Sequence, residues 1–181
     1  MGENRQEYIY IMLSKTNTLL GRAIQRVLGV PYNHCSLALD DSLETIYSFG
    51  RKELRNMFVA GFVQESKSNG FFAVHSNSDI ILLRLSVSRE EKARIREIIS
   101  AFQRGEAPSK YSVLGLMYCY WGIPVERENR LFCSQFVAQV LALAGVNVFD
   151  RPASLIRPHD FLAIPAAESV YTGKIGQYRI A

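Results

Sequence analysis

Apolar positions along the chain alternate with polar ones in some segments and recur at helical spacing in others. EYIYIMLS (7–14) is rich in β-forming residues and predicts a first strand. The next segment, 16–28, predicts an amphipathic helix that ends at Gly29. Its apolar positions are Leu20, Ala23, Ile24, Val27 and Leu28.

A β-hairpin is predicted next, because HCSLALD (34–40) alternates and ETIYSFG (44–50) follows the turn residues Asp40–Ser42. In this antiparallel register His34 faces Ser48. Residues 51–69 carry no regular pattern. GFFAVHS (70–76) and DIILLRLS (79–86) predict two further strands around the turn NSN.

The second half of the chain is more helical. A helix is predicted over 88–105, where Ser88 and Glu91 form a capping box and Gly105 ends the apolar stripe. A short helix is predicted within 111–124, and another helix over 133–144. RPHDFLAIP (157–165) indicates a loop with a short turn or strand, and 168–181 a closing hairpin or edge strand. Helices and strands are partly segregated, which favours one α+β domain over 1–181.

Composition and charge exclude several classes of protein. The 181 residues carry 21 Lys and Arg against 17 Asp and Glu, and both signs are scattered. This pattern is typical of a solvated surface, and no nucleic-acid-binding motif is present. No signal peptide and no apolar run long enough to span a bilayer is recognisable. We therefore expect a cytoplasmic protein without stable membrane insertion, whose three cysteines are free thiols.

Cys133 opens the apolar helix of the second half, on or beside its buried stripe. Backbone N–H groups at a helix start lack intrahelical partners, and the helix dipole favours negative charge there. A thiol at that point is expected to ionise more easily and to act as a nucleophile, with nearby N–H groups for an oxyanion. The alternative interpretation is that Cys133 is a small core residue. We expect Cys35 to be a core residue, and Cys119 to be either a core residue or part of a pocket wall.

A thiolate nucleophile needs a base, and three histidines are available. His34 begins a predicted strand on which Ser36 and Ala38 share its face, so a helix that packs there would bring its cysteine to the imidazole. His159 is the second candidate base, and His75 is expected to be a surface turn residue. No spacing typical of a zinc site occurs, and no metal or cofactor is expected.

Two stretches in this order, NHCSLAL and FCSQFVAQVL, together with IYSFGRK and RPHDFL, resemble the NlpC/P60 superfamily of papain-like cysteine peptidases. The order resembles the circularly permuted branch, which includes the YiiX/YebB-like and lecithin:retinol acyltransferase-like proteins. The resemblance covers roughly residues 8–165. It implies a permuted papain-like fold with an antiparallel sheet against the cysteine helix, Cys133 as nucleophile and His34 as general base.

The family also implies a third polar residue on the strand after the histidine. Ser48 is the candidate, and Glu44, Tyr47 or a backbone carbonyl are the alternatives. Aromatic residues are candidates for a substrate groove, with ordinary packing as the alternative: Tyr32, Tyr111, Tyr118, Tyr120 and Trp121.

The expected function is a cysteine hydrolase that cleaves an amide or ester bond through an acyl-enzyme. Its substrate would be a peptide-like or acylated small molecule. The alternatives are a lipid acyltransferase or lipase of the permuted branch, and a non-catalytic binding module on the same fold.

Overall fold

A computed structural model describes residues 6–15, 31–51, 60–108 and 110–180 of the chain. Within these ranges eight strands form one mixed sheet in the order β7-β6-β4-β3-β2-β1-β5-β8, in which only β6 and β7 pair in parallel. The strands are β1 (Glu7–Lys15), β2 (His34–Ala38), β3 (Ile46–Arg51), β4 (Ala60–Glu65), β5 (Asp79–Val87), β6 (Lys110–Tyr111), β7 (Arg130–Leu131) and β8 (Ala167–Lys174).

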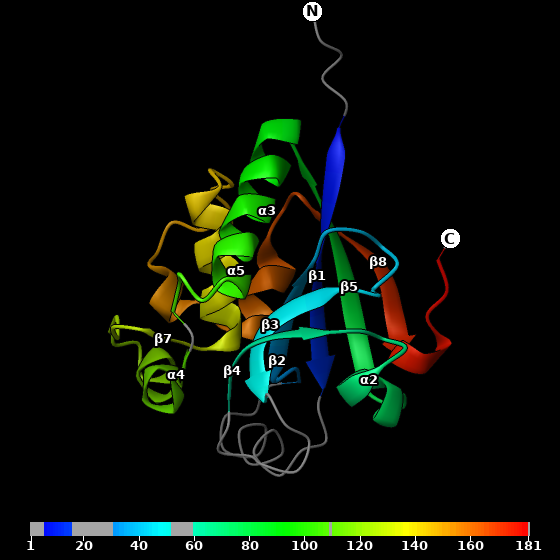
Figure 1. The fold of residues 1–181 in the computed structure, drawn as a ribbon, viewed down its shortest axis with the longest axis horizontal. Coiled ribbons are helices and arrows are strands. Elements are labelled where there is room, and N and C mark those ends of the chain that lie inside the picture. The colour runs from blue at the N-terminus through cyan, green and yellow to red at the C-terminus, as the bar shows by residue number, and fades with distance from the viewer. Residues whose placement is uncertain (1–5, 16–30, 52–59, 109, 181) are drawn as a thin grey trace, which may run out of the picture.

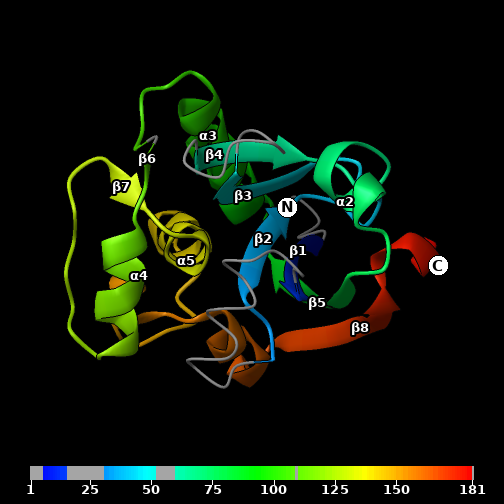
Figure 2. The same cartoon turned by 90° about the horizontal axis from the view of Figure 1, so that it is seen from below.

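The helices cover both faces of this sheet (Figures 1 and 2). They are α2 (Gly70–Val74), α3 (Arg89–Gln103), α4 (Val113–Tyr120) and α5 (Cys133–Leu143), with short 3₁₀ helices η1 (Ala153–Leu155), η2 (Pro158–Ala163) and η3 (Ile175–Gln177). The chain is therefore α+β, as predicted. None of the helices in the described ranges combines the length and apolar character needed to span a bilayer.

Strand β2 shows how the sheet separates two apolar cores. Cys35 and Leu37 belong to the core that packs against α3 and α5. Ala38 belongs to a second core that contains Phe72 of α2 and Ile175 of η3. Side chains alternate across a strand, so odd-numbered residues of β2 face α5 and even-numbered ones face α2.

Several predicted elements are confirmed. The capping box of Ser88 and Glu91 begins α3, and both of its hydrogen bonds are formed. The strand predicted over 7–14 is β1, the aromatic segment contains α4, and β8 is an edge strand beside β5. The helix predicted over 16–28 lies outside the described residues.

Two predictions about the middle of the chain are wrong. Residues 60–65, expected to be irregular, form β4 between β3 and β6. Residues 70–74, expected in a strand, form α2. Phe71 stacks on His75, with ring centroids 4.3 Å apart, and Nδ1 of His75 lies 2.9 Å from the Phe71 carbonyl oxygen. This contact at i and i+4 favours a helical turn over the strand that the aromatic residues indicated.

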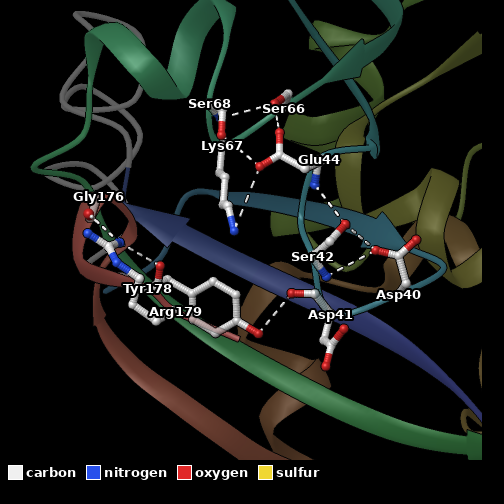
Figure 3. Close-up of polar contacts among 10 residues, drawn as sticks. All are labelled: Asp40, Asp41, Ser42, Glu44, Ser66, Lys67, Ser68, Gly176, Tyr178 and Arg179. Atoms are coloured by element: carbon white, nitrogen blue, oxygen red, sulfur yellow. Dashed lines mark hydrogen bonds and ion pairs between the residues drawn. The ribbon is translucent and has the colours of Figure 1, made fainter. Parts of the chain in front are cut away.

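The turn between β2 and β3 also differs from its prediction, and Figure 3 shows the contacts that fix it. Asp40 accepts hydrogen bonds from the backbone and the hydroxyl of Ser42. The hydroxyl of Tyr178 donates to the Asp41 carbonyl oxygen at 2.9 Å. Glu44 accepts hydrogen bonds from two serines of the chain after β4, Ser66 at 2.7 Å and Ser68 at 2.6 Å.

These contacts hold a connection longer than the predicted three-residue turn. The observed pairs are Leu37 with Tyr47 and Ala38 with Ile46. Continued along the strands, this register places His34 opposite Gly50 rather than opposite Ser48. The prediction was therefore two residues out of register, and this changes the surroundings of His34.

Candidate functional site

Cys133 is the first residue of α5, as the sequence predicted. The N-cap residue is Phe132, which has no side chain able to bond the free N–H groups of the first turn, and no acidic residue lies in that turn. Cys133 is only 2% exposed. The site therefore combines a buried thiol with a helix start whose N–H groups no side chain caps.

The surroundings of the thiol have opposing effects on its ionisation. Burial raises the pKa of the Cys133 thiol, while the backbone N–H groups of Cys35, Ser134 and Cys133 itself act to lower it. Burial is the largest effect, so the thiol is neutral at pH 7. The expectation of an easily ionised thiol is wrong in direction, because the dipole of one helix end does not offset the loss of solvent.

His34 begins β2, one residue before the Cys35 N–H that faces the thiol. The imidazole is partly buried, and burial lowers its pKa to about 4. It is therefore neutral at pH 7 and has one ring nitrogen free to accept a proton. Its Cε1 atom lies 3.6 Å from the position that a Cβ atom would occupy on Gly50.

The face on which His34 lies differs from the prediction. The core cluster of α5 includes Cys35, Leu37 and Phe49, so α5 packs on the odd-numbered face of β2. The sequence predicted that the cysteine helix would pack on the face of His34, Ser36 and Ala38. Among the hydrogen bonds between described residues, none joins Cys133 to His34. The two residues lie beside the same end of β2 without being bonded to each other.

The strand end that carries His34 is paired on one side only. Ser14 of β1 lies opposite His34, whereas pairing between β2 and β3 covers only Leu37 and Ala38. The hydroxyls of Ser14 and Ser36 are buried and have no hydrogen-bond partner among the residues that the structure describes. Polar groups that lack a partner therefore surround this end of β2 on its even-numbered face.

Ser48, the candidate third residue, lies opposite Val63 of β4. Its hydroxyl donates to Oε2 of Glu65 at 3.2 Å. Burial raises the pKa of Glu65 to about 7, and the hydrogen bond from Ser48 acts in the opposite direction. Sequence reasoning missed Glu65, because residues 51–69 gave no strand signal that would have placed a carboxyl group beside Ser48.

The aromatic candidates divide into two groups. Tyr111 and Tyr120 lie near the thiol: burial raises the pKa of both phenols, that of Tyr120 to about 12, and a charge on Cys133 raises them further. Tyr118 and Trp121 lie further out, with ring centroids 6.1 Å apart in an edge-to-face arrangement, and Trp121 is 65% exposed. Tyr32 packs against the core that contains α5.

The exposed face of α4 is apolar. Val113, Leu114 and Met117 expose about half of their surface, and Trp121 follows at helical spacing. The opposite face of α4 packs Leu116 and Cys119 against Phe132, the residue before Cys133. The exposed apolar surface therefore lies on the side of α4 that faces away from Phe132 and the buried thiol.

The remaining candidate residues have their own contacts. Nε2 of His159 is 3.7 Å from Oδ1 of Asp160, and the Nδ1 atom of His159 is buried without a hydrogen-bond partner in the described part of the chain. His75 packs on Phe71 in α2. All three cysteines are free and buried, as expected for Cys35 and Cys119. In the described ranges, no three His, Cys, Asp or Glu side chains are grouped to hold a metal ion.

Comparison of the chain with protein-family models, with curated proteins and with solved structures finds no match. The resemblance to papain-like cysteine peptidases therefore stays a prediction that depends on the motifs of the sequence.

Proposed function

We propose that the protein is a cysteine hydrolase of the permuted papain-like type, in which Cys133 is the nucleophile and His34 the general base. The observation that carries the proposal is the position of the Cys133 thiol. It lies at the start of α5 against the backbone N–H of Cys35, the residue that follows His34. A nucleophile and a neutral base thus lie beside the same end of β2, on opposite faces of the sheet, and the first turn of α5 adds N–H groups next to the nucleophile.

The proposed reaction begins with a neutral thiol. Sγ of Cys133 bonds to the carbonyl carbon of an amide or ester while its proton passes to the imidazole of His34. The imidazolium then protonates the leaving group as the carbonyl–leaving-group bond breaks. Water attacks the resulting thioester, again with His34 as base, and releases the acid and the free thiol. Free N–H groups at the start of α5 would bind the oxyanion.

The proposal requires the imidazole to reach the thiol around the end of β2. His34 is the first residue of its strand and pairs with Ser14 of β1, whereas the pairs between β2 and β3 are Leu37 with Tyr47 and Ala38 with Ile46. A rotation of its side chain therefore breaks no β2–β3 hydrogen bond, and a movement of the adjoining backbone costs the hydrogen bond from the Asn33 N–H to the Ser14 carbonyl oxygen. Catalytic contacts are often loose in structures without substrate and form when substrate binds.

The proposed substrate is a peptide-like or acylated small molecule, hydrolysed without a cofactor in a reducing compartment such as the cytoplasm. A lipid acyl donor is the second candidate within the same chemistry. The exposed apolar face of α4 favours it, since an amphipathic helix of this kind suits an apolar chain or a lipid surface.

Trapping of the acyl-enzyme tests the proposal. Incubation with p-nitrophenyl acetate, followed by peptide mapping in a mass spectrometer, is expected to place one acetyl group on Cys133 and none on Cys119. Cys133→Ser removes the rapid acetylation, and Cys119→Ser leaves it unchanged. Acetylation of Cys133 no faster than that of Cys119 would contradict the proposal.

The same experiment separates catalysis from its main competitor, a binding module on the same fold. The raised pKa of Cys133 and the lack of a hydrogen bond to His34 are what a non-catalytic site would also have. A binding module predicts that Cys133 reacts at the slow rate of a buried thiol and that the rate does not depend on His34.

A further inference from the structure

Arg157 is a partly buried cation beside the candidate site without an acidic partner. Its Nε atom is buried and makes no hydrogen bond with any residue that the structure describes. Its Nη2 atom donates to the backbone oxygen of Tyr120 at 3.3 Å, and the guanidinium lies 5.2 Å from the centre of the Tyr120 ring. The guanidinium also hydrogen-bonds the Cys119 thiol. These contacts leave the Nε–H donor unused, although burial of a charge is costly unless the charge is paired.

The carboxylate nearest in sequence is engaged elsewhere. Oδ2 of Asp160 accepts the backbone N–H of Arg157 at 2.7 Å and pairs with Nη2 of Arg151, also at 2.7 Å. Among the described residues, no carboxylate oxygen lies within ion-pair distance of the Arg157 guanidinium. Arg157 therefore forms no ion pair with the acidic residue closest to it in sequence.

Contacts on two sides tie Arg157 to the start of α5. The hydroxyl of Ser134 donates to the carbonyl oxygen of Ile156 at 2.7 Å, which fixes the chain one residue before Arg157. On the other side, the Tyr120 ring lies under the guanidinium and close enough to Cys133 for a thiolate there to raise the pKa of the phenol. The Tyr120 side chain therefore lies between Cys133 and Arg157 in space.

We infer that Arg157 binds a carboxylate group of the acyl donor that Cys133 attacks. The planar guanidinium presents parallel N–H groups that match the two oxygens of a carboxylate, and the uncapped first turn of α5 adds N–H groups that attract negative charge. The inference rests on the proposed function and adds a substrate class: acids and peptide-like compounds with a carboxylate near the reacting bond.

Two alkylating reagents of nearly equal size, one negatively charged and one neutral, test the inference without an enzymatic assay. Iodoacetate carries a carboxylate, and iodoacetamide carries a neutral amide. The ratio of their second-order rates at Cys133 is measured by peptide mapping for the native protein and for the chain unfolded in urea. If the Arg157 guanidinium binds the carboxylate of the reagent that reacts at Cys133, the native ratio is expected to be about tenfold higher than the unfolded one.

Arg157→Gln should return the ratio to that of the unfolded chain, and Arg157→Lys, which keeps the charge but not the fork, should leave part of the preference. Arg151→Gln is the matched control, because Arg151 is more exposed and already paired with Asp160. A native ratio equal to the unfolded ratio, or a preference that survives in Arg157→Gln, would overturn the inference.

A second comparison separates this inference from the proposed function. Acetylation by p-nitrophenyl acetate is measured beside succinylation by mono-p-nitrophenyl succinate, which carries a carboxylate. Acylation of Cys133 without preference for the succinate would overturn the role of Arg157 alone. Preference for iodoacetate with no acylation by either ester would overturn the hydrolase and keep Arg157 as an anion-binding residue.

Discussion

The hydroxyl of Ser48 donates to Oε2 of Glu65 at 3.2 Å, across neighbouring strands of the sheet. Ser48 was the residue expected to orient His34, and it instead holds a carboxyl group that burial keeps protonated to about pH 7. His34 and Ser48 both lie near Gly50, because a Cβ atom there would be 3.6 Å from Cε1 of His34 and 3.7 Å from the Ser48 hydroxyl oxygen.

Glu65→Gln should make the protein more stable at alkaline pH. Burial raises the pKa of Glu65 from 4.5 to about 7, so its contribution is fully present below pH 4.5 and is lost as pH rises through about 7. Glutamine accepts the Ser48 hydrogen bond without ionising. We expect similar free energies of unfolding at pH 5 and a gain of up to about 3 kcal/mol for the variant at pH 9.

Urea denaturation at both pH values measures this difference. Glu97→Gln, which removes a carboxylate from the exposed side of α3, serves as the control. A Glu65→Gln variant whose stability relative to wild type is the same at pH 5 and pH 9 would contradict the buried, protonated carboxyl.

Ser134→Ala should destabilise the fold and loosen the chain that carries Arg157. Its hydroxyl is fully buried, and its loss leaves the Ile156 carbonyl oxygen without this donor, a change that costs about 1–3 kcal/mol. Ser100→Ala is the matched control, because the Ser100 hydroxyl also donates to a backbone oxygen, that of Arg96, but at an exposed position. Equal unfolding free energies for the two variants would contradict the role of the Ser134 bond.

Substitutions at Gly50 test whether the imidazole lies over this residue. A Cβ atom there would be 3.6 Å from Cε1 of His34, an ordinary contact, so Gly50→Ala should keep acylation of Cys133 within about twofold of wild type. Gly50→Leu needs space that the imidazole and Val63 occupy. It should lose about 1–3 kcal/mol of stability and slow acylation. Tolerance of leucine in both measurements would place His34 elsewhere.

Local patterns predicted many of the elements, but not β4 or α2, and they did not predict the register between β2 and β3. The apolar stripe of α5 and its end near Gly145 depend on neighbouring residues, and these are readable from the sequence. The register of β2 and β3 depends on distant contacts such as that between Tyr178 and Asp41, which no local pattern contains. A change of two residues was enough to separate Ser48 from His34.

The chemistry of the site was predictable only in part. The sequence indicated that Cys133 begins a helix, and this is confirmed. The direction of its pKa was predicted wrongly, because the thiol is buried by segments far from it in sequence. Glu65 gave no signal, since it lies in a strand without a clear alternation, and Arg157 stood in the motif RPHDFL without being assigned a role.

The rate of Cys133 acylation as a function of pH tests the central claim most directly. It is measured with p-nitrophenyl acetate in wild type, in His34→Ala and in His75→Ala, a control histidine that packs on Phe71. A general base must be neutral, and burial holds the pKa of His34 at about 4, so the wild-type rate should fall only as pH drops through about 4. His34→Ala should lower the plateau by roughly 10²–10⁴-fold, and His75→Ala should leave it unchanged. Equal plateaus in the two alanine variants would contradict a catalytic pair of Cys133 and His34.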